Sequence, residues 1–293
     1  MNIYHEQSKN VWKTWGLMAL FCLVIVGLGW FFGMVYDNTG ILIFAVIFSL
    51  FMNFFSYWYS DKIILGLHHA QPIVKEDNPE LWNAVENLAI TAGLPMPKVY
   101  IIPDNAPNAF ATGRDKNHAA VAVTSGLLQI LNRNELEGVI AHELSHIGNK
   151  DILLSTIVVV LVGFVSLLSQ IFIRGSFFRS SKRDGEGGGI LVLIGIILAI
   201  LSPIAVTLIQ LAISRKREYL ADASGALLTR YPEGLASALQ KISAYAAPLK
   251  TASATTAHLF IANPFGSAGK KLSGLFSTHP PTEERIKILR GME

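Results

Sequence analysis

The sequence predicts an α+β membrane protein that is mostly helical, with four transmembrane helices and a soluble part that contains a small β-sheet. The first observation is composition: 51% of the 293 residues are hydrophobic and 15% are charged, whereas soluble domains carry about 25% charged residues. The second is a set of four apolar segments, each near the roughly twenty residues needed to cross a hydrocarbon core. The third is a polar stretch between the second and third segments, which carries strand-like alternation. The apolar segments cover residues 15–35, 41–58, 152–173 and 190–213.

The first two apolar segments are expected to form a membrane hairpin. They are joined by the short turn Asp37-Asn38-Thr39-Gly40, and aromatic residues such as Trp15 and Trp58 fall near the expected membrane interfaces. A cleaved signal peptide is the alternative for the first segment. The apolar region is too long for one and lacks a small-residue cleavage site, which favours a signal anchor.

Residues 60–151 are expected to be soluble. Asn78 and Pro79 predict a helix start, and Gly93 predicts its end. Short strands are expected at residues 99–102, 109–111 and 118–125. A further helix should begin at a cap made by Asn132 with Glu135, or by Asn134 with Glu137.

After the fourth apolar segment the chain becomes polar again. Residues 214–222 predict a helix, and residues 246–277 predict a loop because they are rich in Ala, Ser, Thr and Gly. A terminal helix should follow the prolines Pro280 and Pro281, since proline is favoured in the first turn of a helix.

The sequence motif His142-Glu143-Leu144-Ser145-His146 predicts a catalytic metal site. Residues four apart share one face of a helix, so His142 and His146 can offer two imidazole nitrogens to one ion. Two such ligands plus a carboxylate leave Zn²⁺ with an open position, as in catalytic zinc sites. Glu143 lies close enough to act as a general base on a water molecule there.

A carboxylate from a later helix is needed as the third ligand. Glu218 is the preferred candidate, because Asp222 follows one turn later and could accept a hydrogen bond from a ligating imidazole. Asp151 is the competing candidate. The extended metzincin pattern is excluded, since Asn149 and Ile152 stand where it requires Gly and His.

This choice has a topological consequence. Glu218 and the histidines can meet only if an even number of membrane crossings separates them, which makes residues 152–213 a second hairpin inserted between ligands. The expected parts are therefore residues 1–60 (first hairpin), 61–151 (first catalytic part), 152–213 (second hairpin) and 214–293 (second catalytic part). Lysines near the first hairpin and Arg215 to Arg217 place the site in the cytoplasm, although four basic residues from Arg174 to Arg183 argue the opposite for the second hairpin.

Composition also excludes some classes of function. The net charge of +3, without a basic run interleaved with aromatic residues, argues against nucleic-acid binding. The single cysteine, Cys22, excludes a disulfide framework. A membrane chaperone or scaffold that binds zinc without hydrolysis is one alternative, although it would have no use for Glu143. A metal transporter is another, weakened by the lack of His or acidic residues within the four spans.

The chain resembles the HtpX-type membrane zinc metalloproteases, gluzincins related to the CAAX prenyl proteases. Four groups of residues carry the resemblance, and they lie at residues 108–113, 141–151, 217–222 and 278–281. The resemblance implies one zinc ion per subunit held by His142, His146 and Glu218, with Glu143 as general base. It also implies Asp222 as the hydrogen-bond partner of a ligand.

Further roles come from the resemblance alone. His279 and Arg285 are expected to contact the substrate carbonyl or the transition state. Asn108, Ala109, Phe110 and Ala111 are expected to form an exposed strand edge that binds extended substrate through its backbone. The expected substrates are unfolded or damaged membrane proteins, in stress-related quality control at the bacterial inner membrane beside other membrane proteases. A prenyl-protein protease is the alternative, but the larger membrane chamber expected of one is missing.

Overall fold

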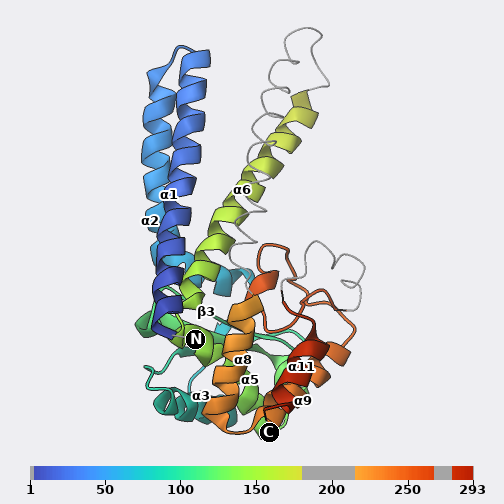
Figure 1. Cartoon of the computed structure of the whole chain (residues 1–293). Coiled ribbons are helices and arrows are strands. Elements are labelled where there is room, and N and C mark those ends of the chain that lie inside the picture. Colours follow the sequence, from blue (N-terminus) through green and yellow to red (C-terminus); the bar gives the residue numbers. More distant parts are fainter. Residues whose placement is uncertain (1–2, 180–214, 267–278, 293) are drawn as a thin grey trace.

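The computed structural model describes residues 3–179, 215–266 and 279–292, and it has two parts. Three long helices, α1, α2 and α6, project from a globular half that contains the sheet and the remaining helices (Figure 1). The amino-terminal end of α1 lies at the base of the long helices, beside the globular half.

Helices α1 (Ile3–Val35) and α2 (Thr39–Leu67) form the first predicted hairpin. In the turn, Asp37 adopts a φ of 48°, and the Asn38 side chain accepts a hydrogen bond from the Gly40 amide. Both helices are long and apolar enough to cross a membrane. Their outer faces expose large apolar side chains, as a lipid-facing surface should. These include Leu23, Phe31, Ile43, Phe44, Ile47, Leu50, Phe51 and Phe54.

Helix α6 (Asp151–Arg179) begins one residue before the third apolar segment and packs against the hairpin through Leu154, Ile157 and Leu161. It qualifies as a candidate span only together with α5 (Arg133–Gly148), from which it is bent by 84°. The described part of the chain thus has two candidate spans, or three if this bent pair counts as one. The fourth apolar segment, residues 190–213, lies outside the described residues.

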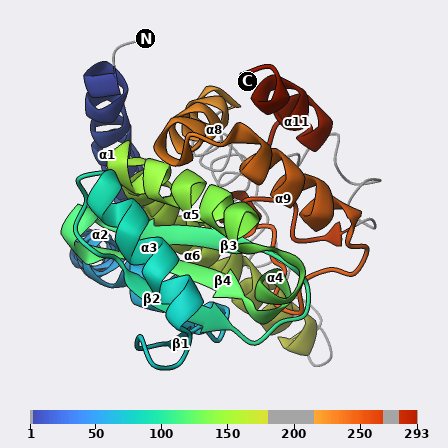
Figure 2. The same ribbon diagram turned by 90° about the horizontal axis from the view of Figure 1, so that it is seen from below.

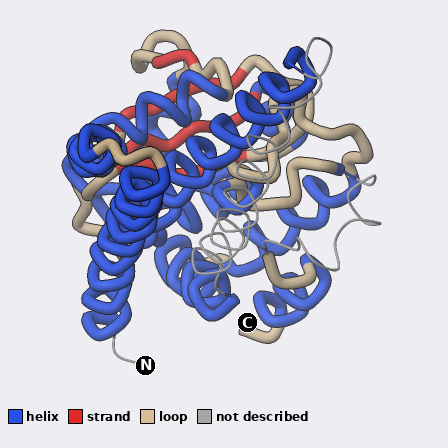
Figure 3. Tube along the Cα trace, turned by 90° about the horizontal axis from the view of Figure 1, so that it is seen from above, coloured by secondary structure: helices blue, strands red, loops and turns tan. Residues whose placement is uncertain are grey.

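The sheet has the strand order β1-β2-β4-β3 (Figure 2). Strand β1 (Gln71–Pro72) is antiparallel to β2 (Lys98–Ile102), which runs parallel to β4 (Ala119–Thr124), and β3 (Ala109–Gly113) is antiparallel to β4. The three predicted strands are present. The two-residue β1 was not predicted because it is too short for any alternation to show. Seen from above, the strands gather on one side of the globular half (Figure 3).

The helices of the globular half largely start where capping residues predict. The Asn78 side chain accepts from the Leu81 amide at the start of α3 (Pro79–Thr91). Asn132 and Glu135 form a reciprocal capping box at the start of α5, which decides between the two predicted caps. The other α-helices described in this half are α4 (Ser125–Ile130), α8 (Arg215–Thr229), α9 (Pro232–Ala244) and α11 (Thr282–Arg290), with short 3-10 helices at Lys116–His118 and Ala257–Leu259.

The described part of the predicted 246–277 loop is packed against the sheet. The Ile261 amide donates to the Ala109 carbonyl at 2.9 Å, and Phe260 forms a β-bridge with Phe110. Residues 257–262 are buried. The small and polar residues around this apolar segment therefore hid it, although it extends the sheet beyond its edge strand.

Candidate metal centre

Helix α5 presents the two predicted imidazoles on one face. Their Nε2 atoms lie 3.2 Å apart, and the side chain of His142 is 1% exposed while that of His146 is 16% exposed. Four-residue spacing brings the rings together, as the helix period requires.

Glu218 on α8 completes a three-residue cluster. One carboxylate oxygen lies 3.5 Å from His146 Nε2 and the other lies 3.9 Å from His142 Nε2. All three possible ligand atoms fall within 4.8 Å of one another. Gly225 allows this approach, because a Cβ there would lie 3.0 Å from the backbone nitrogen of His142. Glu218 precedes Gly225 by seven residues, so both face α5.

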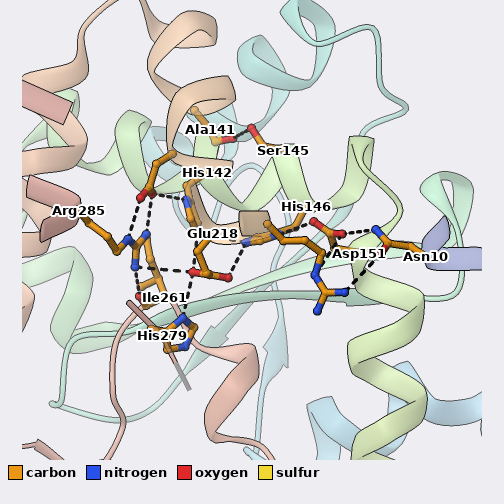
Figure 4. Close-up of polar contacts among 12 residues, drawn as sticks. Asn10, Ala141, His142, Ser145, His146, Asp151, Glu218, Ile261, His279 and Arg285 are labelled. Atoms are coloured by element: carbon orange, nitrogen blue, oxygen red, sulfur yellow. Dashed lines mark hydrogen bonds and ion pairs between the residues drawn. The ribbon is translucent and has the colours of Figure 1, made fainter. Parts of the chain in front are cut away.

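A carboxylate faces Nδ1 of each imidazole, the ring nitrogen that points away from the three-residue cluster (Figure 4). Asp222 Oδ1 lies 2.9 Å from His142 Nδ1, and Asp151 Oδ2 lies 3.0 Å from His146 Nδ1. Such partners hold the proton on Nδ1 and leave the Nε2 lone pair free for a metal. The structure therefore places Asp151, the competing third ligand, on the far side of the His146 ring from the cluster.

Two residues of this site were missed from the sequence. Asn10 on α1 donates from Nδ2 to Asp151 Oδ1 at 2.6 Å, and Arg217 lies 3.6 Å from the same oxygen. Arg217 also donates to Asn10 Oδ1 at 3.4 Å. Asn10 and Arg217 are both buried. The only signal for Asn10 was that it is a polar residue shortly before an apolar segment. Arg217 was used for membrane orientation and for the family resemblance, without a role at the site.

Arg285 holds Asp222, the carboxylate next to His142, through a buried ion pair. Its Nε and Nη2 donate to the two oxygens of Asp222 at 2.8 and 2.7 Å, and its Nη1 donates to the Ile261 carbonyl at 2.9 Å. Its side chain is 1% exposed and its Nη1 lies 3.8 Å from Glu218. The expectation that Arg285 contacts substrate does not fit this position, because the guanidinium is enclosed and already bonded to the protein.

His279 is better placed for contact with substrate. Its Nδ1 lies 2.9 Å from Glu218 Oε2, and its Nε2 has no hydrogen-bond partner among the described residues. The ring lines the same small cavity as Glu143 and Ala111. Burial alone would raise the pKa of Glu218, but the charge and hydrogen bond of His279, with the charges of His146 and Arg285, hold it well below its usual value.

Glu143 is buried at the wall of this cavity. Burial raises the pKa of its carboxyl to about 7, with the Glu218 charge adding to the effect. The His146 charge and a hydrogen bond from the Ala111 amide act in the opposite direction. A carboxyl with a pKa near neutrality can both accept and return a proton, as a general base in hydrolysis must.

The charges of the cluster suit a divalent cation. Among the described residues, four buried carboxylates, on Glu143, Asp151, Glu218 and Asp222, lie near two buried guanidinium groups, those of Arg217 and Arg285. Burial lowers the pKa of His146, but the hydrogen bond of Asp151 and the charges of Glu218 and Asp151 outweigh it and raise that pKa to about 9. The site therefore favours a cation where the imidazoles and Glu218 converge, since buried charge needs a partner.

The predicted substrate edge is only partly free. At its start, Ala109 is paired with Ile261, and the Asn108 side chain donates to the Ala262 carbonyl at 2.9 Å. Phe110 is fully buried against Phe260. An exposed edge along all four predicted residues is therefore wrong, because the chain's own 260–262 segment covers the first three. Ala111 alone lines the cavity.

Comparison with known proteins identifies the family. Residues 75–293 match the family model described as "Peptidase family M48". The chain belongs to this family. Two curated relatives, each named "Protease HtpX homolog", come from Caldanaerobacter subterraneus subsp. tengcongensis and Pyrococcus furiosus. The first is 50% identical over 99% of this chain and 98% of its own length, and the second 51% identical over 96% of both.

A solved structure shows a similar fold. The crystal structure of Ste24p from S. mikatae aligns with a TM-score of 0.52 at 18% identity, covering 95% of this chain and 66% of that longer chain. Family membership makes the chain a metalloprotease, and its apolar helices mark it as a membrane protein. The resemblance to HtpX-type proteases is thereby confirmed, and the scaffold and prenyl-protein alternatives are not favoured.

Replacing Asp151 by Asn should lower zinc affinity about 10- to 100-fold. The Asn side-chain amide is neutral, so it fixes the tautomer of His146 less strongly than the carboxylate does. Zinc retention during titration with a chelator measures the effect. The Asp37→Asn variant in the hairpin turn makes the same chemical change away from the centre and should bind zinc like the wild type. Equal zinc affinity in the two variants would contradict the assigned role of Asp151.

Proposed function

We propose that this chain is a zinc-dependent endopeptidase that cleaves unfolded or damaged membrane proteins. The observation that carries the proposal is the convergence of His142 Nε2, His146 Nε2 and Glu218 beside the buried carboxyl of Glu143. Two imidazoles and a carboxylate match the donor set of catalytic zinc sites. One zinc ion per subunit would be held by these three residues.

The chain's own groups provide the proton transfers. Bound zinc would supply Lewis acidity toward the peptide carbonyl and toward water. Glu143 takes the proton of the attacking water and delivers it to the leaving amine. His279 Nε2, which lies at the cavity without a partner in the described residues, is placed to donate to the carbonyl oxygen as it gains charge. Asp222 and Arg285 keep His142 and Glu218 in position.

Substrate recognition is proposed to use the edge of β3 at Ala111. Backbone pairing there accepts any extended sequence, which suits unfolded polypeptides. A substrate that extends toward Ala109 would have to displace residues 260–262, because that part of the edge is already paired. Most backbone groups of a folded protein are already paired, so few of its segments are available for this pairing.

The proposed location is the bacterial inner membrane, with four transmembrane helices and the site facing the cytoplasm. Residues 152–213 would then be the hairpin inserted between the ligands. The contact between Asn10 and Asp151 supports one part of this arrangement, because it keeps the start of α1 on the same side as the metal centre. Lys9, Lys13 and Lys62 then lie on the positive, cytoplasmic side. We propose other membrane quality-control proteases as partners, because they act on the same class of substrate.

The proposal is tested with full-length protein in detergent or nanodiscs. Chelation should abolish cleavage of an unfolded membrane protein, and stoichiometric zinc should restore it. The same substrate in its folded state should be cleaved at least about tenfold more slowly, since local unfolding must come first. Cleavage that persists in the metal-free protein, or that is equally fast on the folded substrate, would overturn the proposal.

A further inference from the structure

A second cavity lies apart from the metal centre, between the end of α2 and the sheet. Its volume is about 500 Å³, within the range of sites for small molecules. It is lined by aromatic and charged side chains together. Its lining residues include Phe54, Trp58, Asp61, Lys62, Lys98 and Arg114. None of them takes part in the proposed chemistry.

The cavity sits at the level where the membrane surface should lie. Trp15 of α1 stacks on Tyr57 of α2, and Trp12 and Trp58 are exposed beside them. Tryptophan and tyrosine collect at the interface between lipid and water. On the apolar side of this belt Phe54 is exposed, and on its polar side α2 continues with Asp61 and Lys62.

Positive charge dominates the lining. Lys62, Lys98 and Arg114 face one carboxylate, that of Asp61. The guanidinium of Arg114 lies 4.5 Å from the ring centre of Trp58, and its Nε lies 3.6 Å from Asp115. The Arg114 side chain is 17% exposed, so it is held in place rather than free in solvent. The ammonium of Lys62 lies 5.4 Å from the ring centre of Tyr59.

We propose that this cavity binds the phosphate headgroup of an anionic phospholipid from the leaflet on the catalytic side. Arg114, Lys62 and Lys98 would contact the phosphate, because cations placed at a membrane surface attract anionic lipid. An acyl chain would follow the exposed face of α2 at Phe54 and Trp58. This apolar wall, continuous with the membrane helix, distinguishes a lipid from free phosphate.

The site has a consequence for the enzyme. Arg114 directly follows Gly113, the last residue of β3, and this strand carries Ala111 at the metal cavity. A lipid bound at Arg114 would hold the end of this strand against the membrane surface. The inference goes beyond the proposed peptidase activity and does not depend on it.

The test measures retained lipid on zinc-loaded, full-length protein by native mass spectrometry. Nanodiscs of phosphatidylcholine with phosphatidylglycerol are compared with nanodiscs of phosphatidylcholine alone. We expect retention of phosphatidylglycerol, which the Lys62→Gln/Lys98→Gln double variant weakens about tenfold or more. Lys287→Gln, on the exposed face of α11 and outside the cavity lining, removes one positive charge and should retain lipid like the wild type.

Two further arms separate the possible ligands. In the first arm, Phe54→Ala should weaken lipid retention. In the second, inorganic phosphate at millimolar concentration should not displace the lipid, from the wild type or from Phe54→Ala. The proposal is overturned if the double variant retains as much phosphatidylglycerol as Lys287→Gln, if phosphatidylcholine alone is retained equally, or if inorganic phosphate displaces the lipid. Exposed lysines are replaced so that folding is preserved, and unchanged thermal unfolding of each variant verifies this.

Discussion

Glutamine in place of Glu143 should lower the rate of peptide hydrolysis about 10²- to 10⁴-fold, which is the usual contribution of a positioned general base. The amide has nearly the same shape and can still accept the hydrogen bond of the Ala111 amide. It cannot take a proton from water. His142, His146 and Glu218 are unchanged, so zinc binding should persist. The cleavage rate of an unfolded membrane protein and the zinc content measure the two outcomes.

A matched control lies on the same helix. Glu137 pairs with Arg133 at the surface, and Glu137→Gln removes the same charge away from the cavity. It should cleave at the wild-type rate. If Glu143→Gln cleaves as fast as Glu137→Gln while both contain zinc, the base is another residue and the proposed mechanism fails. If Glu143→Gln loses its zinc, the carboxyl has a structural role in the centre that its position does not predict.

The parts of this fold that sequence predicted are those set by local pattern. The hairpin follows from two apolar runs and a polar turn, and the capping box of Asn132 and Glu135 starts α5 where its spacing predicts. The convergence of His142 and His146 follows from the helix period alone. Glu218 was predicted by the chemistry that a zinc site requires, combined with the placement of Asp222 one turn later.

The parts that sequence did not predict depend on contacts between distant segments. Asn10 lies 141 residues from its partner Asp151, and nothing in the local sequence around either residue indicates the pair. Residues 260–262 cover the edge of β3, although their surroundings have the composition of a loop. Arg285 shows the same difficulty, because its neighbours in α11 are charged and solvated while it is fully enclosed.

The contact between Asn10 and Asp151 links the membrane hairpin directly to the candidate metal centre. The membrane hairpin does more than anchor the globular half, since α1 supplies a hydrogen bond to the carboxylate that orients His146. The candidate metal centre is therefore built from four separated regions: α1, the α5–α6 corner, α8 and residues 279–290. Its integrity should depend on how the hairpin sits against the globular half.

Replacing Arg285 by Met should destabilise the protein by about 3–5 kcal/mol, because it leaves the buried carboxylate of Asp222 without its cation. The two groups form a bidentate pair at 2.8 and 2.7 Å, and each side chain is 1% exposed. Chemical or thermal unfolding of the metal-free protein in detergent measures the loss. Adding Asp222→Asn should recover part of the stability while zinc affinity stays low, because His142 has lost its charged partner.

The chain contains a control with the same geometry at its surface. Arg290 binds Glu233 through two hydrogen bonds of 2.9 and 2.8 Å, but the Arg290 side chain is 47% exposed. Arg290→Met should therefore cost at most about 1 kcal/mol. Burial raises the pKa of Asp222, but Arg285 outweighs it and lowers that pKa to about 2. The stabilisation is thus complete above about pH 4 and should fade as the pH falls toward 2. Equal losses in the two arginine variants at neutral pH would show that burial does not decide the strength of the Asp222 pair.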